Sequence, residues 1–97
     1  MSNVANEIRS QLGRGTLYML GAHNLITDDG NNLSFKIKGS KKVNHINIIY
    51  IESLDLYTME FKKIWGLKVK DVAVIDNVYA DQMHSLIEEN TGLCTSL

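Results

Sequence analysis

The stretch LSFKIKGSKKVNHINIIYI, residues 33–51, decides the fold class because its apolar side chains recur at every second position. Successive side chains of an extended strand point to opposite faces, so this spacing is typical of half-buried strands. Residues 39–42, GSKK, interrupt the alternation with the composition of a hairpin turn. The pattern predicts two antiparallel strands that share an apolar face. That face carries Leu33, Phe35, Ile37, Ile46, Ile48 and Tyr50.

Two later segments continue the alternation and predict a third and a fourth strand. Residues 57–65, YTMEFKKIW, place three large apolar side chains on one face. Residues 67–75, LKVKDVAVI, begin with Leu67 and Val69 on the apolar face, but the pattern slips near Asp71, where a β-bulge would restore the register. Because the connections are short, the four strands are expected to form an antiparallel meander.

Helices near both ends are expected to cover the apolar face. Residues 4–12 have apolar positions at helical spacing and precede the glycines of residues 13–15. A second helix is expected after Asn77 as N-cap, with Gly92 as its left-handed C-terminal residue and the tail at 93–97 folded back. Its apolar stripe would carry Tyr79, Met83, Leu86, Ile87 and Asn90.

The expected fold class is therefore α+β, with an N-terminal and a C-terminal helix on one face of a four-stranded antiparallel meander. Residues 16–26, TLYMLGAHNLI, fit a helical turn or a strand, and the pattern does not choose between them. A chain of 97 residues has room for one modest core, so residues 1–97 are expected to form a single domain.

The composition is that of a soluble globular protein, with 44% hydrophobic and 22% charged residues. The longest apolar runs are too short to cross a bilayer, and residues 1–10 lack the apolar block of a secretory signal. We therefore expect a cytosolic protein that does not associate with membranes.

Charge is distributed unevenly, although the formal net charge is only -1. Residues 34–70 carry eight lysines against three carboxylates, whereas residues 71–97 carry five carboxylates and no lysine or arginine. Such separation either steers a charged partner or is compensated within the fold.

Strand alternation predicts a basic sheet face opposite the core. Three interpretations remain open for it: contact with a nucleic-acid backbone, recognition of an acidic protein surface, or a merely solvated face. The predicted aromatic residues of the strands fall on the inner face, which counts against base stacking. This basic sheet face would carry Lys36, Lys38, Lys62, Lys68 and Lys70, with Lys41 and Lys42 at its rim.

Two alternative binding surfaces are an acidic helix and a hairpin tip. The acidic helix would present Asp76, Asp81, Glu88 and Glu89 outside its apolar stripe. Trp65 precedes Gly66 at the predicted tip, where a tryptophan either anchors an interface or covers the edge of the core.

The sequence contains no recognisable catalytic or metal-binding constellation. His23, His45 and His84 lie on different predicted elements without ligand-like spacing, and Cys94 has no flanking nucleophile motif. We expect no metal, no cofactor and no enzymatic activity.

Four segments resemble a family of short proteins from bacteriophages and bacterial mobile elements. They are residues 17–24, 33–48, 55–68 and 78–97, with the motifs LGA-x-N, D-x-Y-x-x-E-F, YAD and TGL-x-x-SL. The resemblance spans nearly the whole chain after residue 16 and implies no catalytic residue; His84 and Cys94 lie outside its pattern.

The resemblance implies an accessory protein of the host bacterial cytoplasm that acts by binding. We expect it to inhibit a host defence protein, as anti-CRISPR proteins do, without catalysis. The alternative is a nucleic-acid-binding protein that uses the basic sheet face, followed by nucleotide sequestration or a small enzyme. An uncovered edge strand would also permit a homodimer.

Overall fold

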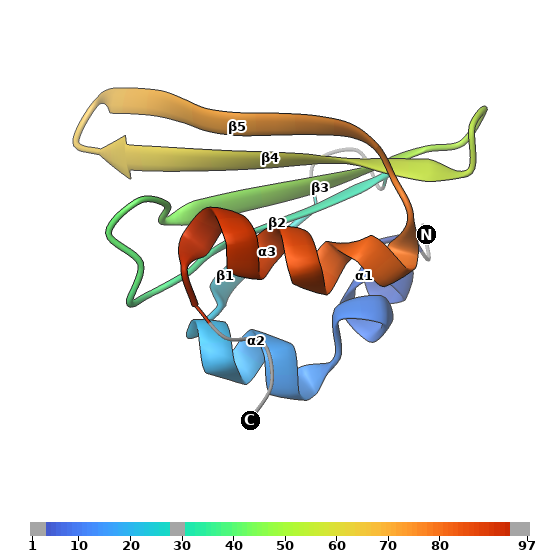
Figure 1. Cartoon of the computed structure of the whole chain (residues 1–97), viewed down its shortest axis with the longest axis horizontal. Helices are drawn as coiled ribbons and strands as arrows, with labels where there is room; N and C mark the ends of the chain where they lie inside the picture. Colours follow the sequence, from blue (N-terminus) through green and yellow to red (C-terminus); the bar gives the residue numbers. More distant parts are fainter. Residues whose placement is uncertain (1–3, 28–30, 94–97) are drawn as a thin grey trace.

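The computed structural model describes residues 4–27 and 31–93. Its helices and its strands follow one another in blocks along the chain. Two helices come first, five strands follow, and a helix closes the described chain (Figure 1). In order they are α1 (Val4–Leu12), α2 (Arg14–Leu20), β1 (His23–Ile26), β2 (Asn32–Lys36), β3 (His45–Ile51), β4 (Leu56–Trp65), β5 (Lys68–Val78), the 3-10 turn η1 (Ala80–Gln82) and α3 (Met83–Thr91).

The strands form one antiparallel meander in the order β1-β2-β3-β4-β5. The α+β class is confirmed, but the expected strand number was wrong, since the described residues form five strands. The extra strand, β1, comes from the ambiguous stretch 16–26, which is helical up to Leu20 and extended from His23. Gly21 makes this change of direction with a φ of 64°, a conformation that costs glycine little.

A glycine with a positive φ also separates α1 from α2. The N-terminal helix ends at Leu12 as predicted, because Gly13 has a φ of 84°. The chain then becomes helical again at Arg14 and carries Gly15 within α2, so the glycines of residues 13–15 interrupt the helix only once.

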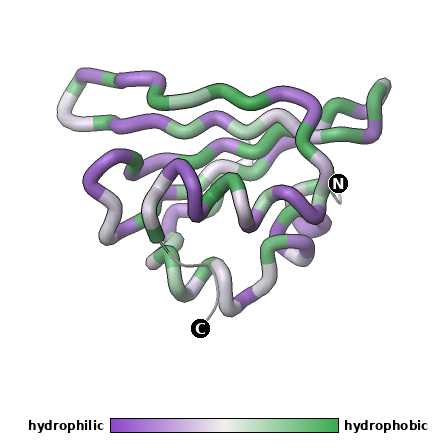
Figure 2. Tube along the Cα trace, viewed as in Figure 1, coloured by the Kyte–Doolittle hydropathy of each residue, from purple (hydrophilic) through white to green (hydrophobic). Residues whose placement is uncertain are grey.

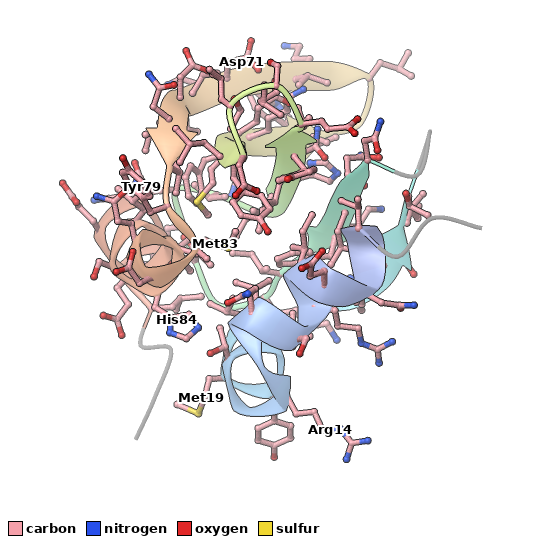
Figure 3. The ribbon with its side chains drawn as sticks, turned by 90° about the vertical axis from the view of Figure 1, so that its right-hand side faces the viewer. Arg14, Met19, Asp71, Tyr79, Met83 and His84 are labelled. Carbon is pink, nitrogen blue, oxygen red and sulfur yellow. The ribbon has the colours of Figure 1, made fainter. Side chains whose placement is uncertain are left out.

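All three helices lie on one side of the sheet, which curves around them (Figures 1 and 3). Hydrophilic and hydrophobic residues alternate along the strands (Figure 2), and the hydrophobic ones on the inner face pack against the helices. Burying each such side chain contributes about 1.5–3 kcal/mol. The core contains Ile8, Leu12, Leu20, Leu33, Phe35, Ile37, Val43, Ile46, Ile48, Tyr57, Met59, Phe61, Val78, Met83 and Ile87.

The bulge predicted near Asp71 is confirmed, and it lies in β5. Phe61 of β4 pairs with Ala73 of β5, whereas the next residue, Lys62, pairs with Asp71. Val72 is therefore the extra residue of β5. After it, odd-numbered residues such as Ala73 lie on the inner face, whereas before it even-numbered residues such as Lys70 lie on that face.

The prediction that Leu67 and Val69 face the core was wrong. Their side chains are 104% and 58% exposed. Val69 pairs with Ile64 and points to the outer face because of the bulge at Val72. Leu67 lies in the turn of the β4–β5 hairpin, which extends beyond the three helices (Figure 1). Trp65 pairs with Lys68 across a two-residue turn at the end of this hairpin. Apolar residues there have no layer to pack against.

The last helix begins later than predicted. Asn77 lies in β5 with a φ of 58°, and Tyr79 is the residue that caps η1, its backbone N–H donating to Gln82 Oε1 at 2.9 Å. Tyr79 is consequently 60% exposed and does not belong to the apolar stripe. Gly92 does end the helix in the left-handed conformation, and Leu93 packs against the core. The predicted tail contacts of residues 94–97 lie outside the described residues.

Candidate anion-binding site

All eight lysines of the chain lie toward one end of the sheet. They occupy the end of β2, the loop that follows it, the end of β4 and the start of β5, which antiparallel pairing brings together. Carboxylates Glu52 and Asp55 lie in the β3–β4 turn at the opposite end. The basic and acidic regions of the sequence therefore remain largely separate in the sheet.

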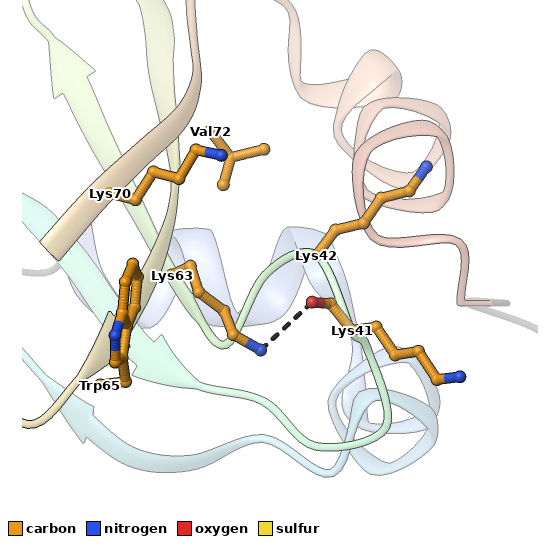
Figure 4. A pocket seen from close by; sticks show the side chains of 6 residues that line it. All are labelled: Lys41, Lys42, Lys63, Trp65, Lys70 and Val72. Atoms are coloured by element: carbon orange, nitrogen blue, oxygen red, sulfur yellow. Dashed lines mark hydrogen bonds between the residues drawn. The ribbon is translucent and has the colours of Figure 1, made fainter.

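A concave surface with a volume of about 590 Å³ lies at this basic end (Figure 4). That volume falls within the range of about 300–1,000 Å³ typical of small-ligand sites. The described residues that line it include no carboxylate. We call this surface the lysine–tryptophan pocket, and its lining is Lys41, Lys42, Lys63, Trp65, Lys70 and Val72.

Strand register places the hairpin residues of the pocket on one face. Lys63 pairs with Lys70, and Trp65 pairs with Lys68, so these side chains point to the side of the sheet that faces the helices. The bulge at Val72 is the reason that Lys70 points to this side. Because the hairpin extends past the helices, the face remains open there.

The loop between β2 and β3 forms the other wall of the pocket. Ser40 links this loop to α3 by a hydrogen bond. Ser40 Oγ donates to the Thr91 carbonyl at 2.8 Å and accepts the backbone N–H groups of Lys42 and Val43, each at 3.2 Å. These bonds hold the backbone of the two loop lysines in a defined position.

Asn44 fastens the same loop to β4. Its Oδ1 accepts the backbone N–H of Ile64 at 2.7 Å, and its Nδ2 donates to the Ile64 carbonyl at 2.6 Å. Lys63 Nζ also donates to the Lys41 carbonyl at 3.2 Å (Figure 4). The pocket is therefore built from two walls that are linked by hydrogen bonds, which limits the cost of ordering it around a ligand.

Trp65 brings an aromatic face to these cations. It is 47% exposed and lies next to the left-handed Gly66 of the hairpin turn, whose φ is 59°. An exposed indole in a pocket that lysines also line can stack on a planar ring while those lysines contact its phosphates.

The predicted basic sheet face is divided between two surfaces. Lys62 lies on the outer face of the sheet, opposite Lys63, and Lys36 shares that outer face through the cross-strand pairs that both make with His45. Lys70 and Lys68 lie on the inner face, so the prediction of one shared face was wrong. The physical reason is the bulge, which shifts the parity of β5 between Asp71 and Ala73.

Sequence reasoning missed Lys63 and Val72 as pocket residues. The alternation of β4 assigns Lys63 to the inner face, where a core residue would normally be expected. The slip near Asp71 was the available signal, because moving Lys70 to the inner face places it directly opposite Lys63.

The predicted acidic helix is only partly formed as such. Glu88 and Glu89 are exposed on α3 and Asp81 on η1. Asp76 instead lies in β5, where its Oδ1 accepts a hydrogen bond from Thr58 Oγ1 at 3.1 Å.

His84 has a structural place in the fold. Its Nε2 lies 2.9 Å from the Leu12 carbonyl and 3.3 Å from Thr16 Oγ1, so it links α3 to the junction of α1 and α2 (Figure 3). No group of three or more histidine, cysteine, aspartate or glutamate side chains close enough to hold a metal occurs among residues 4–27 and 31–93. Cys94 lies outside this part of the chain.

None of the described helices is long and apolar enough to span a membrane. Comparison of the chain with protein-family models, curated proteins and solved structures finds no match.

Proposed function

We propose that this protein binds single-stranded nucleic acid at the lysine–tryptophan pocket and acts by binding rather than by catalysis. The observation that carries the proposal is the position of Trp65, which is 47% exposed among four lysines that line the same concave surface. Single-strand binders combine a positive groove for the phosphates with aromatic side chains for the bases.

The charge balance of the pocket favours a polyanion. The described lining contains four lysines and no carboxylate, so a phosphate-rich strand replaces counterions there. Lys63 Nζ donates to the Lys41 carbonyl and has two further N–H groups for phosphate. On the outer face, by contrast, Lys62 already lies 3.7 Å from Glu60 and pairs across the sheet with Asp71.

The pocket is also suited to binding with little sequence preference. Arginine, the commonest reader of base edges, is absent from the lining, and lysine acts on phosphate as a point charge. Stacking on an indole tolerates every base because each base has a flat aromatic face.

Binding can be measured with labelled single-stranded oligonucleotides at salt concentrations between about 50 and 200 mM. Intrinsic fluorescence gives an independent signal, because Trp65 is the only tryptophan of the chain. We expect affinity to fall steeply with salt and Trp65 emission to change on binding.

Two double variants test whether binding depends on the pocket or only on the total positive charge of the protein. Lys63→Gln with Lys70→Gln should weaken binding strongly and reduce the magnitude of the salt slope by about 0.7 for each phosphate that the variant no longer neutralises. Lys36→Gln with Lys62→Gln removes the same charge from the outer face and is the matched control for short oligonucleotides. Equal reductions in affinity for both variants would contradict the assignment of the pocket.

A second candidate function is stoichiometric inhibition of a host defence protein, as the family resemblance implies. The observation that favours it is the exposed apolar row on β5 and its turn, where Leu67, Val69 and Val74 are 104%, 58% and 54% exposed. Exposed apolar patches of this kind often mark protein interfaces. β5 is also the outermost strand of the described sheet, which permits strand pairing with a partner or a second copy.

A tagged pull-down from host lysate distinguishes the two candidates when it is run with and without nuclease. Recovery of partners that disappears after nuclease treatment supports nucleic-acid binding. A single host protein retained in stoichiometric amount after nuclease treatment supports inhibition, and Val69→Lys with Val74→Lys should then abolish its recovery.

A further inference from the structure

The outer face of the sheet carries a second concave surface without carboxylates among its described lining residues. It has a volume of about 300 Å³ and lies on the other side of the β2–β3 loop from the lysine–tryptophan pocket. Its lining is His23, Lys36, Ile37, Lys38, Asn44, His45 and Ile64.

This second surface is built by cross-strand pairing. His23 of β1 pairs with Lys36 of β2, Lys36 pairs with His45 of β3, and His45 pairs with Lys62 of β4. Directly paired residues share one face of a sheet, so imidazole and ammonium groups alternate across four neighbouring strands. The row spans about 14 Å, since neighbouring strands lie about 4.8 Å apart.

The two concave surfaces share one wall, which is the loop between β2 and β3. Lys41 and Lys42 of this loop line the first pocket, whereas Lys38 and Asn44 line the second. The side chain of Asn44 holds the loop to Ile64, so both surfaces are fixed to the same part of β4. A ligand that passes from one surface to the other therefore crosses the loop that carries Lys38, Lys41 and Lys42.

We propose that a single strand bound at the lysine–tryptophan pocket continues over this loop and places its next phosphates on the row formed by His23, Lys36 and His45. This inference rests on the proposed function, and it adds a second subsite on the opposite face of the sheet. Lys36 and Lys38 contact phosphate there. His23, whose Nδ1 lies 3.0 Å from the Gly21 carbonyl, presents Nε2 to phosphate.

A length series of oligonucleotides tests the inference. An oligonucleotide of about 4 nucleotides should occupy the first pocket alone, whereas one of about 12 nucleotides should reach both subsites, since single-strand sites cover about 4–16 nucleotides. We expect the longer strand to bind at least tenfold more tightly and to show a steeper salt dependence.

Lys36→Gln with Lys38→Gln should remove most of that gain and leave the short oligonucleotide unaffected. Lys63→Gln with Lys70→Gln should weaken both lengths. Arg9→Gln with Arg14→Gln removes two positive charges from the α1–α2 junction and controls for total charge. Circular dichroism verifies that each variant is folded.

The outcomes separate the second subsite from the first. If both lengths bind equally tightly, or if Lys36 and Lys38 variants weaken them equally, the second subsite is refuted while the first pocket stands. If neither length binds, the proposed function fails and the second subsite fails with it.

Discussion

The hydroxyl group of Tyr50, in β3, donates a hydrogen bond to the Asp55 carboxylate across the β3–β4 turn at a distance of 2.5 Å. Asp55 has a φ of 52°, in the left-handed region, so it both shapes the turn and accepts this bond. The hydrogen bond to Asp55 raises the pKa of Tyr50 from 10.0 to about 12, with smaller contributions from burial and from nearby charges. This relationship lies at the acidic end of the sheet, opposite the lysine–tryptophan pocket.

We predict that alkaline pH weakens the fold through Tyr50. Because the folded state holds the pKa of Tyr50 above its ordinary value of 10.0, the stabilisation is complete below about pH 10 and is lost as the pH rises to about 12. Urea unfolding at several pH values should show this fall in the free energy of unfolding for the native chain and a smaller one for Tyr50→Phe. Asp55→Asn, which tolerates the same backbone conformation, should lower the pKa of Tyr50; an unchanged phenol titration would contradict the assigned cause.

Substitution by alanine should destabilise the protein at Gly21 and stabilise it at Gly15. Gly21→Ala places a side chain at a φ of 64° and its Cβ 3.1 Å from Lys38 Cβ, so we expect a decrease of about 1–2 kcal/mol in the free energy of unfolding. Gly15 lies inside α2 with nothing within 4 Å of an added Cβ, so Gly15→Ala should stabilise by about 0.5–1 kcal/mol. Thermal unfolding of the two variants should give shifts in opposite directions.

Asn44 should affect both stability and ligand binding. Asn44→Ala leaves the N–H and carbonyl of Ile64 without their side-chain partner, and removing each hydrogen bond costs about 0.5–1.5 kcal/mol. The loop that carries Lys41 and Lys42 then keeps the backbone bond from the Asn44 N–H to the Lys62 carbonyl and the bond from Lys63 Nζ to the Lys41 carbonyl, but it loses both side-chain bonds to Ile64. Oligonucleotide affinity should fall by more than it does for Thr58→Ala, which removes a hydrogen bond to Asp76 between β4 and β5, away from the loop. Equal affinities would show that the loop position is irrelevant to binding.

Substitutions at Trp65 and Phe61 should show that nucleic-acid affinity and stability depend on different residues of β4. Phe61 is fully buried, and Phe61→Ala should cost about 3–5 kcal/mol in the free energy of unfolding. Trp65 is 47% exposed on the same strand, so Trp65→Ala should change stability far less and reduce nucleic-acid affinity by about 1–3 kcal/mol, the range for removal of one base–aromatic stack. Trp65→Phe should recover part of the affinity. A large decrease in stability for Trp65→Ala would indicate that the indole belongs to the core.

The alternation in residues 33–51 and 57–65 predicted β2, β3 and β4 correctly because their inner faces are buried by helices along most of their length. Ile46, Ile48 and Met59, for example, are all fully buried. The same reasoning failed for Leu67, which lies in the hairpin turn, and for Val69, which the bulge at Val72 places on the outer face. It also failed for Asn77, whose left-handed conformation belongs to an irregularity at the end of β5 rather than to a helix cap.

The candidate site was predictable in its chemistry and not in its geometry. The concentration of lysines in residues 34–70 and a tryptophan at a hairpin tip are properties of the sequence, whereas the exposure of Trp65 comes from the structure. The pocket depends on Lys63 lying opposite Lys70, and that pairing requires the single extra residue at Val72. A shift of one residue reverses the face of every side chain beyond it, so local alternation alone could not assign these lysines.

By itself the sequence determined the α+β class, the meander and the separation of basic from acidic regions, because these follow from local periodicity and composition. The tertiary structure alone decided which lysines meet. Lys41 is distant in the chain from Lys63 and Lys70, which belong to one hairpin. The three come together through the strand register, the bulge and the hydrogen bonds that Ser40 and Asn44 make to other elements. Such contacts depend on the packing of several segments at once, which no single stretch of sequence encodes.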